Sequence, residues 1–247
     1  MSGHSKWSTI KRRKGANDAK KGKIFSRLVK EIQVSIREGG ADIDSNPALR
    51  LAIQNAKGAN MPKDNIERAI KRASSDGASL QEVTFEGYGP KGIAFYIECL
   101  TDNNLRTISN VRSIFSRGGG NLGTNGSLSF LFDRKGVFTV PGNDLNQEEF
   151  ELEIIDAGVE DCELEEDVFI ITTAIEDFSS VQKKLDEMEV NIENAQLQRI
   201  PNSTEKLDYE SAGKVIKMIE DFEELEDVQN VYHNLEVTEE IAALLQE

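Results

Sequence analysis

Residues that catalyse reactions or bind metals are scarce in this sequence. It has two cysteines, Cys99 and Cys162, and two histidines, His4 and His233, and the members of each pair lie far apart. Zinc sites and redox pairs use such residues at short spacing, so neither is expected. A Ser-His-Asp or Cys-His catalytic set would need one of these histidines, and neither has a suggestive context. We therefore predict a non-enzymatic protein without metal or cofactor.

Long apolar runs are also absent. No stretch reaches the roughly 18 apolar residues that a membrane span needs, and the basic N-terminus lacks the apolar segment of a secretory signal. The composition, 38% hydrophobic and 30% charged, is that of an ordinary soluble protein. We expect a cytoplasmic location, and a reducing compartment suits two separated cysteines.

Positive charge is scarce overall but concentrated at one end. The chain has 29 Lys and Arg against 44 Asp and Glu, a net charge of −15, which taken alone argues against a nucleic-acid-binding protein. However, residues 1–72 hold 17 cations against 7 acids, whereas residues 73–247 hold 12 against 37. The first part thus has a surplus of 10 and the rest a deficit of 25. Such asymmetry indicates a separate partner for the basic part.

The candidate binding residues lie in the first 37 positions, where eleven cations are opposed by two acids. Seven of them belong to residues 1–22, which we interpret as a flexible basic arm, namely Lys6, Lys11, Arg12, Arg13, Lys14, Lys20 and Lys21. The other four cluster opposite the apolar stripe of the following helix, namely Lys23, Arg27, Lys30 and Arg37. Any one lysine is explained as solvated charge, but the set favours phosphate contacts.

Trp7, the only tryptophan, lies inside this arm. Its indole is expected either to stack on an unpaired base or to hold the arm against the helical bundle as a hydrophobic plug. Both interpretations stay open.

Residues 118–123 formally contain the GxGxxG pattern. A dinucleotide-binding run follows a strand and opens a helix, whereas this one follows a predicted helix and leads into a strand. We therefore predict a structural turn that uses glycine's positive φ and close backbone approach. A sharper alternative is a backbone surface against RNA or a neighbouring domain, helped by the secondary candidates Arg106 and Arg117.

Two acidic runs, 163–167 and 223–227, have carboxylates of the type that binds Mg²⁺. We interpret them first as solvated charge at a hairpin and at a helix end. An enzyme that uses carboxylates alone stays an open alternative.

Periodicity and turn residues predict an α+β protein in three parts. Residues 1–77 form a basic helical domain, with helices at 23–37, 46–58 and 61–77. A second, α/β domain combines residues 78–133 with 206–247, and its elements are strands at 83–88, 92–100, 127–132 and 228–233 and helices at 103–116 and 209–222. Residues 134–205 have the βαββαβ order of a ferredoxin-like domain, inserted in the second. A short helix follows Thr238.

Several motifs resemble the YebC family, which includes the mitochondrial translational activator of cytochrome oxidase subunit I. The resemblance covers essentially the whole chain and rests on Gly3-His4-Ser5-Lys6-Trp7, Lys23-Ile24-Phe25-Ser26-Arg27-Leu28, Ala59-Asn60-Met61-Pro62-Lys63-Asp64-Asn65-Ile66, Glu86-Gly87-Tyr88-Gly89-Pro90, Thr101-Asp102-Asn103 with Arg106-Thr107, and Gly119-Gly120-Asn121-Leu122-Gly123. It implies three domains, the third inserted in the second, and nucleic-acid binding in the cytoplasm without a known cofactor.

The family resemblance leaves two functions open. Its members are customarily described as DNA-binding transcriptional regulators, and some are regarded as ribosome-associated translation factors that assist synthesis through consecutive prolines. A DNA-binding regulator should present a recognition helix, and the short helices of 1–77 offer no clear one. The charge split favours RNA slightly, with rRNA or tRNA on the ribosome as partner.

Overall fold

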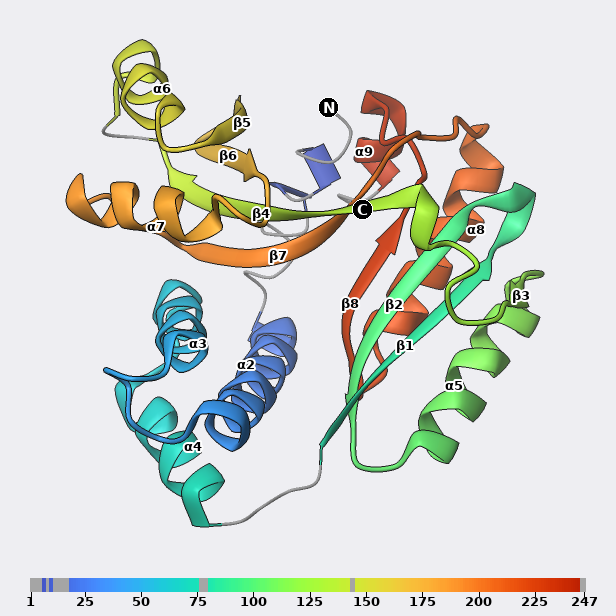
Figure 1. The fold of residues 1–247 in the computed structure, drawn as a ribbon. Coiled ribbons are helices and arrows are strands. Elements are labelled where there is room, and N and C mark those ends of the chain that lie inside the picture. Colours follow the sequence, from blue (N-terminus) through green and yellow to red (C-terminus); the bar gives the residue numbers. More distant parts are fainter. Residues whose placement is uncertain (1–5, 8, 11–17, 76–79, 143–144, 245–247) are drawn as a thin grey trace.

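The computed structural model describes residues 6–7, 9–10, 18–75, 80–142 and 145–244. The first long segment forms three helices around one apolar core (Figure 1): α2 (Asp18–Gly39), α3 (Pro47–Gly58) and α4 (Lys63–Ser75). The side chain of Asn46 caps α3 by accepting a 3.0 Å hydrogen bond from Leu49 N, and proline takes the first helical position. Helix α2 begins five residues before the predicted Lys23, because the polar residues there continue the helix beyond its apolar stripe.

A first sheet has the strand order β3-β1-β2-β8 and is covered on one face by two helices. Its strands are β1 (Gln81–Tyr88), β2 (Ala94–Thr101), β3 (Asn121–Leu122) and β8 (Val228–His233), and its helices are α5 (Asn104–Arg117) and α8 (Tyr209–Glu223). A short turn, η1 (Pro90–Gly92), joins β1 to β2, and α9 (Glu239–Leu244) ends the described chain. Strand β8 pairs with β2 in antiparallel fashion, so the C-terminal segment returns to this sheet as expected.

A second sheet is formed by the residues between β3 and α8 and has the strand order β5-β6-β4-β7. Its elements follow the predicted βαββαβ order: β4 (Phe132–Pro141), α6 (Gln147–Ile155), β5 (Val159–Glu165), β6 (Val168–Thr173), α7 (Phe178–Glu187) and β7 (Asn194–Pro201). The ferredoxin-like unit and the α+β class are confirmed. The exact domain boundaries stay predictions.

The strand predicted at 127–132 is wrong. This segment forms a turn and a short 3₁₀ helix, η2 (Ser129–Leu131), before β4 begins at Phe132. The buried carboxylate of Glu86 accepts hydrogen bonds from the backbone nitrogens of Gly126 (2.7 Å) and Leu128 (2.5 Å). These bonds fold the chain into a turn, although its alternating polar and apolar residues are typical of a strand.

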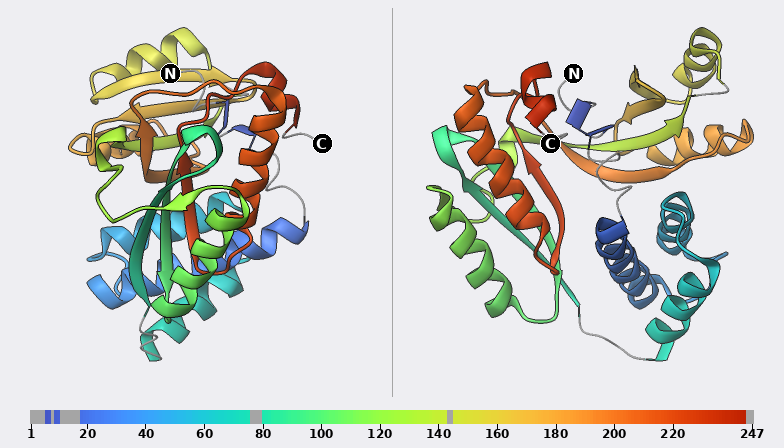
Figure 2. Two further views of the ribbon diagram at one scale, coloured as in Figure 1. Left: turned by 90° about the vertical axis from the view of Figure 1, so that its right-hand side faces the viewer. Right: turned by 180° about the vertical axis from the view of Figure 1, so that it is seen from behind.

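The three parts meet where two sheet edges face α2. Strands β7 and β8 are edge strands of their sheets, and α2 and α3 lie beneath β7 in Figure 1, an arrangement that Figure 2 shows from the side and from behind. The Asn55 side chain of α3 both donates to and accepts from the backbone of Ala195 at 2.9 Å. The Arg199 guanidinium of β7 lies 3.9 Å from the ring centre of Tyr96 in β2 and pairs with Glu98. Within the described ranges, no helix is long and apolar enough to cross a membrane.

Candidate nucleic-acid interface

The basic face of α2 is occupied by acceptors from elsewhere in the chain. Lys23 pairs with Glu224, which caps the C-terminal end of α8. The Arg27 guanidinium donates a 2.9 Å hydrogen bond to the backbone oxygen of Glu223, the last residue of that helix. Terminal carbonyls of a helix lack intrahelical partners and carry partial negative charge, so cations stabilise them. Helix α2 therefore supplies the cations that cap α8.

Lys30 lies deeper in the same contact. Its ammonium donates to the backbone oxygens of Glu226 (2.8 Å) and Leu100 (3.1 Å) and lies 3.4 Å from Asp227 Oδ1. Arg37, the fourth predicted cation of this face, donates to the backbone oxygen of Leu80 and pairs with Glu38. All four cations thus contact protein acceptors, and phosphate contacts would require them to exchange partners.

Asp227 is the centre of this contact and is 7% exposed. It accepts hydrogen bonds from Arg106 Nη2 (2.8 Å) and from the hydroxyl of Thr107 (2.9 Å). Burial alone would raise the pKa of the Asp227 carboxyl. The hydrogen bonds from Arg106 and Thr107 and the charge of Lys30 outweigh burial and hold that pKa below its ordinary value. The interpretation of 223–227 as solvated charge is therefore wrong for Asp227.

The described apolar residues of the arm pack against the first sheet. Ile10 is 8% exposed within the core that α5 and α8 cover, and Thr9 is buried. The half-buried Trp7 ring lies edge-on to His233, with ring centres 4.5 Å apart. This geometry favours the plug interpretation of Trp7, but the ring packs on the core of the first sheet and not on the helical bundle as expected. Four predicted cations lie outside the described residues, namely Lys11, Arg12, Arg13 and Lys14, and so does the side chain of Lys20. Of the other two lysines of the arm, Lys6 is half-buried and Lys21 is exposed.

Five exposed cations of α3 and α4 were not among the predicted binding residues. Lys57 at the end of α3 and Lys63, Arg68, Lys71 and Arg72 on α4 are all exposed. Their charge belongs to the surplus of residues 1–72, but no periodicity distinguished them from ordinary surface residues. They form the exposed basic surface of the described helical part.

The secondary candidates Arg106 and Arg117 lie on α5, and the glycine run joins α5 to the first sheet. Arg106 is engaged by Asp102 and Asp227, and Arg117 is exposed. Gly120 lies so close to β1 that a Cβ there would meet Tyr88 O at 2.3 Å, and Gly119 has φ +75°. The run ends α5 and brings β3 against β1, as the structural interpretation predicted.

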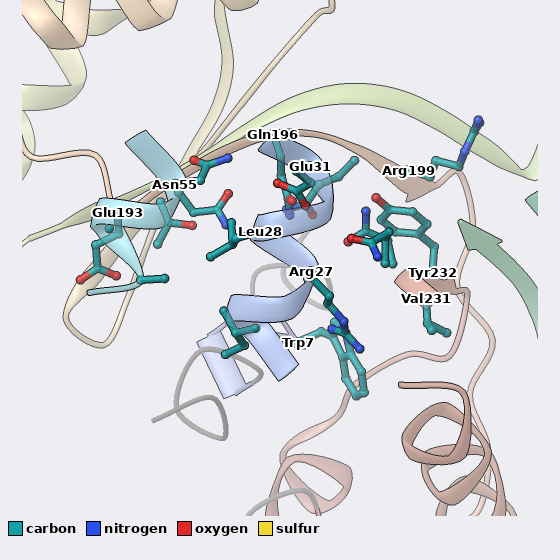
Figure 3. Close-up of a pocket in the computed structure, with 18 of the residues that line it drawn as sticks. Trp7, Arg27, Leu28, Glu31, Asn55, Glu193, Gln196, Arg199, Val231 and Tyr232 are labelled. Atoms are coloured by element: carbon teal, nitrogen blue, oxygen red, sulfur yellow. The ribbon is translucent and has the colours of Figure 1, made fainter. Parts of the chain in front are cut away.

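A cavity of about 690 Å³ opens where the three parts meet, and residues of α2, β7 and β8 surround it together with Trp7 (Figure 3). Among the predicted binding residues, Trp7, Lys21 and Arg27 contribute to its wall. Burial raises the pKa of Glu31, another lining residue, from 4.5 to about 7, although the charge of Arg27 partly offsets this. This cavity was not predicted from the sequence, because its walls come from distant segments.

The cysteines offer no nucleophile near neutral pH. Burial raises the pKa of the Cys99 and Cys162 thiols to about 12, and neighbouring carboxylates, Asp227 beside Cys99 and Glu151 beside Cys162, add to the shift.

Comparisons with known proteins cover both the helical part and the two sheets. Residues 5–76 match the model of the TACO1/YebC protein N-terminal domain, and residues 80–235 match that of the TACO1/YebC second and third domain. The chain belongs to the TACO1/YebC family. It is 52% identical to a probable transcriptional regulatory protein of Amoebophilus asiaticus, with 95% of this chain and 98% of the relative covered.

Two further proteins are similar to this chain over nearly its whole length. A probable transcriptional regulatory protein of Rubrobacter xylanophilus is 49% identical, with 98% of each chain covered. The crystal structure of a conserved hypothetical protein from Aquifex aeolicus is similar with a TM-score of 0.83 and 46% identity, covering 90% of this chain and 93% of that one. The family and its fold are therefore established for this chain.

Proposed function

We propose that this protein binds nucleic acid through the basic residues of its first 72 positions and regulates gene expression in the cytoplasm without catalysing a reaction. The main supporting observation is the charge split, a surplus of 10 in residues 1–72 beside a deficit of 25 in the remainder. Basic segments of this kind attract phosphates, while an acidic remainder limits non-specific coating. The names of the relatives, probable transcriptional regulatory proteins, support a regulatory role.

We assign the first contact with nucleic acid to the basic arm, with Lys11, Arg12, Arg13, Lys14 and Lys20, because these cations are concentrated in the sequence. The exposed cations of α4 extend this contact. Lys23, Arg27, Lys30 and Arg37 follow only if nucleic acid displaces the acceptors at 223–227 and Leu80. A ligand rich in phosphate is the natural competitor for such acceptors.

RNA is the ligand that the packing of the helices favours. A helix-turn-helix protein inserts one free helix into the major groove of DNA. In the described helical part, α3 is hydrogen-bonded to β7 through Asn55, and the basic face of α2 contacts the α8–β8 turn. The exposed cations of the described helical part lie mainly on α4. Single-stranded or irregular RNA can bind such a surface without an inserted recognition helix.

Duplex DNA is the second candidate, supported by the names of the relatives. RNA and duplex DNA are distinguished as ligands by measuring the affinity of the full chain for single-stranded RNA, ribosomes and a duplex promoter fragment at one salt concentration. We expect RNA or ribosomes to bind more tightly than DNA. Preference for a particular duplex over random DNA would instead establish the transcriptional role, and no binding to any of them would overturn the proposal.

A further inference from the structure

The cavity between the three parts has apolar side chains of α2 in its wall and the edge strands of two sheets beside them. Strands β7 and β8 are the free edges of their two sheets, and α2 lies across them. Edge strands carry backbone donors and acceptors that no neighbouring strand uses. Its volume, about 690 Å³, falls within the roughly 300–1,000 Å³ of sites that hold small organic ligands.

Gln229 is the most unusual residue of this wall. Glu98 of β2 pairs with Asn230 and Cys99 pairs with Val228, so Gln229 is an extra residue in β8, a β-bulge. Bulges re-aim side chains and are frequent beside functional sites. The Gln229 side chain lines the cavity and is 7% exposed, and neither its Nε2 nor its Oε1 has a hydrogen-bond partner among the described residues.

The opposite wall of the cavity, formed by β7, also carries carboxamide side chains. Asn194, Gln196 and Gln198 alternate along β7, so their side chains share one face of the strand, and all three line the cavity. The Asn194 Oδ1 atom is also buried without a hydrogen-bond partner in the described structure. Across all of its walls, seven of the lining residues are Asn or Gln. Buried polar atoms without partners are rare in proteins, because each loses its bonds to water without compensation.

Carboxamides present a donor and an acceptor side by side, the pattern that pairs with the edge of a nucleobase. Trp7 supplies an aromatic ring at the same cavity, and Lys21 and Arg27 supply positive charge within reach of a phosphate. We propose that this cavity binds one unstacked nucleobase, between the carboxamides of β7 and Gln229 of β8. The base comes from a free nucleoside or from an RNA chain, and the second source rests on the proposed function.

The single tryptophan makes the test specific, because Trp7 lies at the cavity and a base that enters it changes the indole's fluorescence. The full chain is titrated with adenosine, guanosine, cytidine and uridine, and with a short single-stranded RNA that contains all four bases. We expect a saturable change with at least one nucleoside or with the RNA. The variant Gln229→Leu should weaken that binding about tenfold or more, since it leaves the base edge without its partner.

Two further variants keep the test decisive. Gln147→Leu makes the same chemical change on an exposed turn of α6 and should bind like the unaltered protein. Gln196→Leu, on the opposite wall, should weaken binding and replaces Gln229→Leu as the test if that variant does not fold. If Gln229→Leu and Gln196→Leu bind as tightly as Gln147→Leu and the unaltered protein, the inference is overturned. It is also overturned if no nucleoside and no RNA changes the fluorescence.

The two proposals fail differently. RNA that binds in an electrophoretic shift but leaves Trp7 fluorescence unchanged, with no nucleoside response, overturns the cavity inference and leaves the proposed function intact. A nucleoside response that Gln229→Leu abolishes, without binding of any RNA or DNA, supports the cavity and overturns the proposed function.

Discussion

Burial brings the titration of the Glu31 carboxyl close to neutral pH. Burial raises its pKa from 4.5 to about 7, so the folded protein holds this proton over a pH range in which the unfolded chain has released it. The contribution to stability is complete below pH 4.5 and is lost as the pH rises through about 7. It amounts to about 3 kcal/mol, because one pKa unit corresponds to about 1.4 kcal/mol.

Replacing Glu31 by glutamine should remove this dependence. Between pH 4.5 and 8 the unaltered protein is expected to lose about 3 kcal/mol of unfolding free energy that Glu31→Gln retains. Urea denaturation at several pH values measures both curves, with Glu38→Gln as the control from the exposed end of the same helix. Parallel curves for Glu31→Gln and the unaltered protein would show that Glu31 is not buried as an acid.

Gly120 tests the structural role of the glycine run. A Cβ at this position would meet the backbone oxygen of Tyr88 at 2.3 Å, so Gly120→Ala should cost about 1–3 kcal/mol of stability. Gly213 lies in the middle of α8, where a Cβ would meet no atom of another element within 4 Å, and Gly213→Ala should stabilise the protein by about 0.5–1 kcal/mol. Thermal denaturation measures whether each variant is less or more stable than the unaltered protein. Equal changes in stability for Gly120→Ala and Gly213→Ala would refute the close approach of the glycine run to β1.

At the scale of whole elements, helix α2 connects the helical part to the first sheet. Its Lys30 ammonium binds two backbone carbonyls and approaches Asp227. Lys30→Gln should therefore cost about 1.5–3 kcal/mol, the range for hydrogen bonds to a charged group. Lys63→Gln, on the exposed surface of α4, should change stability by less than about 0.5 kcal/mol. Chemical denaturation measures the unfolding free energy of both variants. If Lys30→Gln lowers it no more than Lys63→Gln does, this face of α2 is solvated.

Local signals predicted most of the elements correctly. Asn46 followed by proline marked the start of α3, and Asn103 marked α5, because capping is decided by neighbouring residues. The segment at 127–132 was mispredicted because Glu86, some forty positions earlier, controls its backbone. Contacts of this kind have no signature in a short window of sequence.

The candidate site was less predictable than the fold for the same reason. Periodicity placed Lys23, Arg27, Lys30 and Arg37 on one helix face, which was sufficient to identify a basic surface. It could not show that the α8–β8 turn covers this surface, because that turn lies nearly two hundred residues away. Gln229 was equally hidden, since its exposure to the cavity depends on a bulge in the pairing of β2 with β8.

On the scale of the whole molecule, charge is segregated along the chain and then partly neutralised by folding. The acidic turn at 223–227 contacts Lys23, Arg27 and Lys30 of α2. The other cations of residues 1–72 include those of the arm and the exposed ones of α4. We therefore assign the strongest phosphate contacts to Lys11, Arg12, Arg13 and Lys14. The proposed mode of binding depends on this assignment more than on any other.

The salt dependence of RNA affinity tests that assignment most directly. One variant changes Lys11, Arg12, Arg13 and Lys14 to glutamine, and a control changes the exposed Lys183, Lys206, Lys214 and Lys217, so both lower the net charge by four. With a single-stranded ligand, each phosphate that is no longer neutralised should flatten the plot of log K against log salt by about 0.7, or about 3 for all four. We predict this flattening for the arm variant and an unchanged slope for the control. Equal slopes in both variants and the unaltered protein, with folding confirmed by circular dichroism, would contradict it.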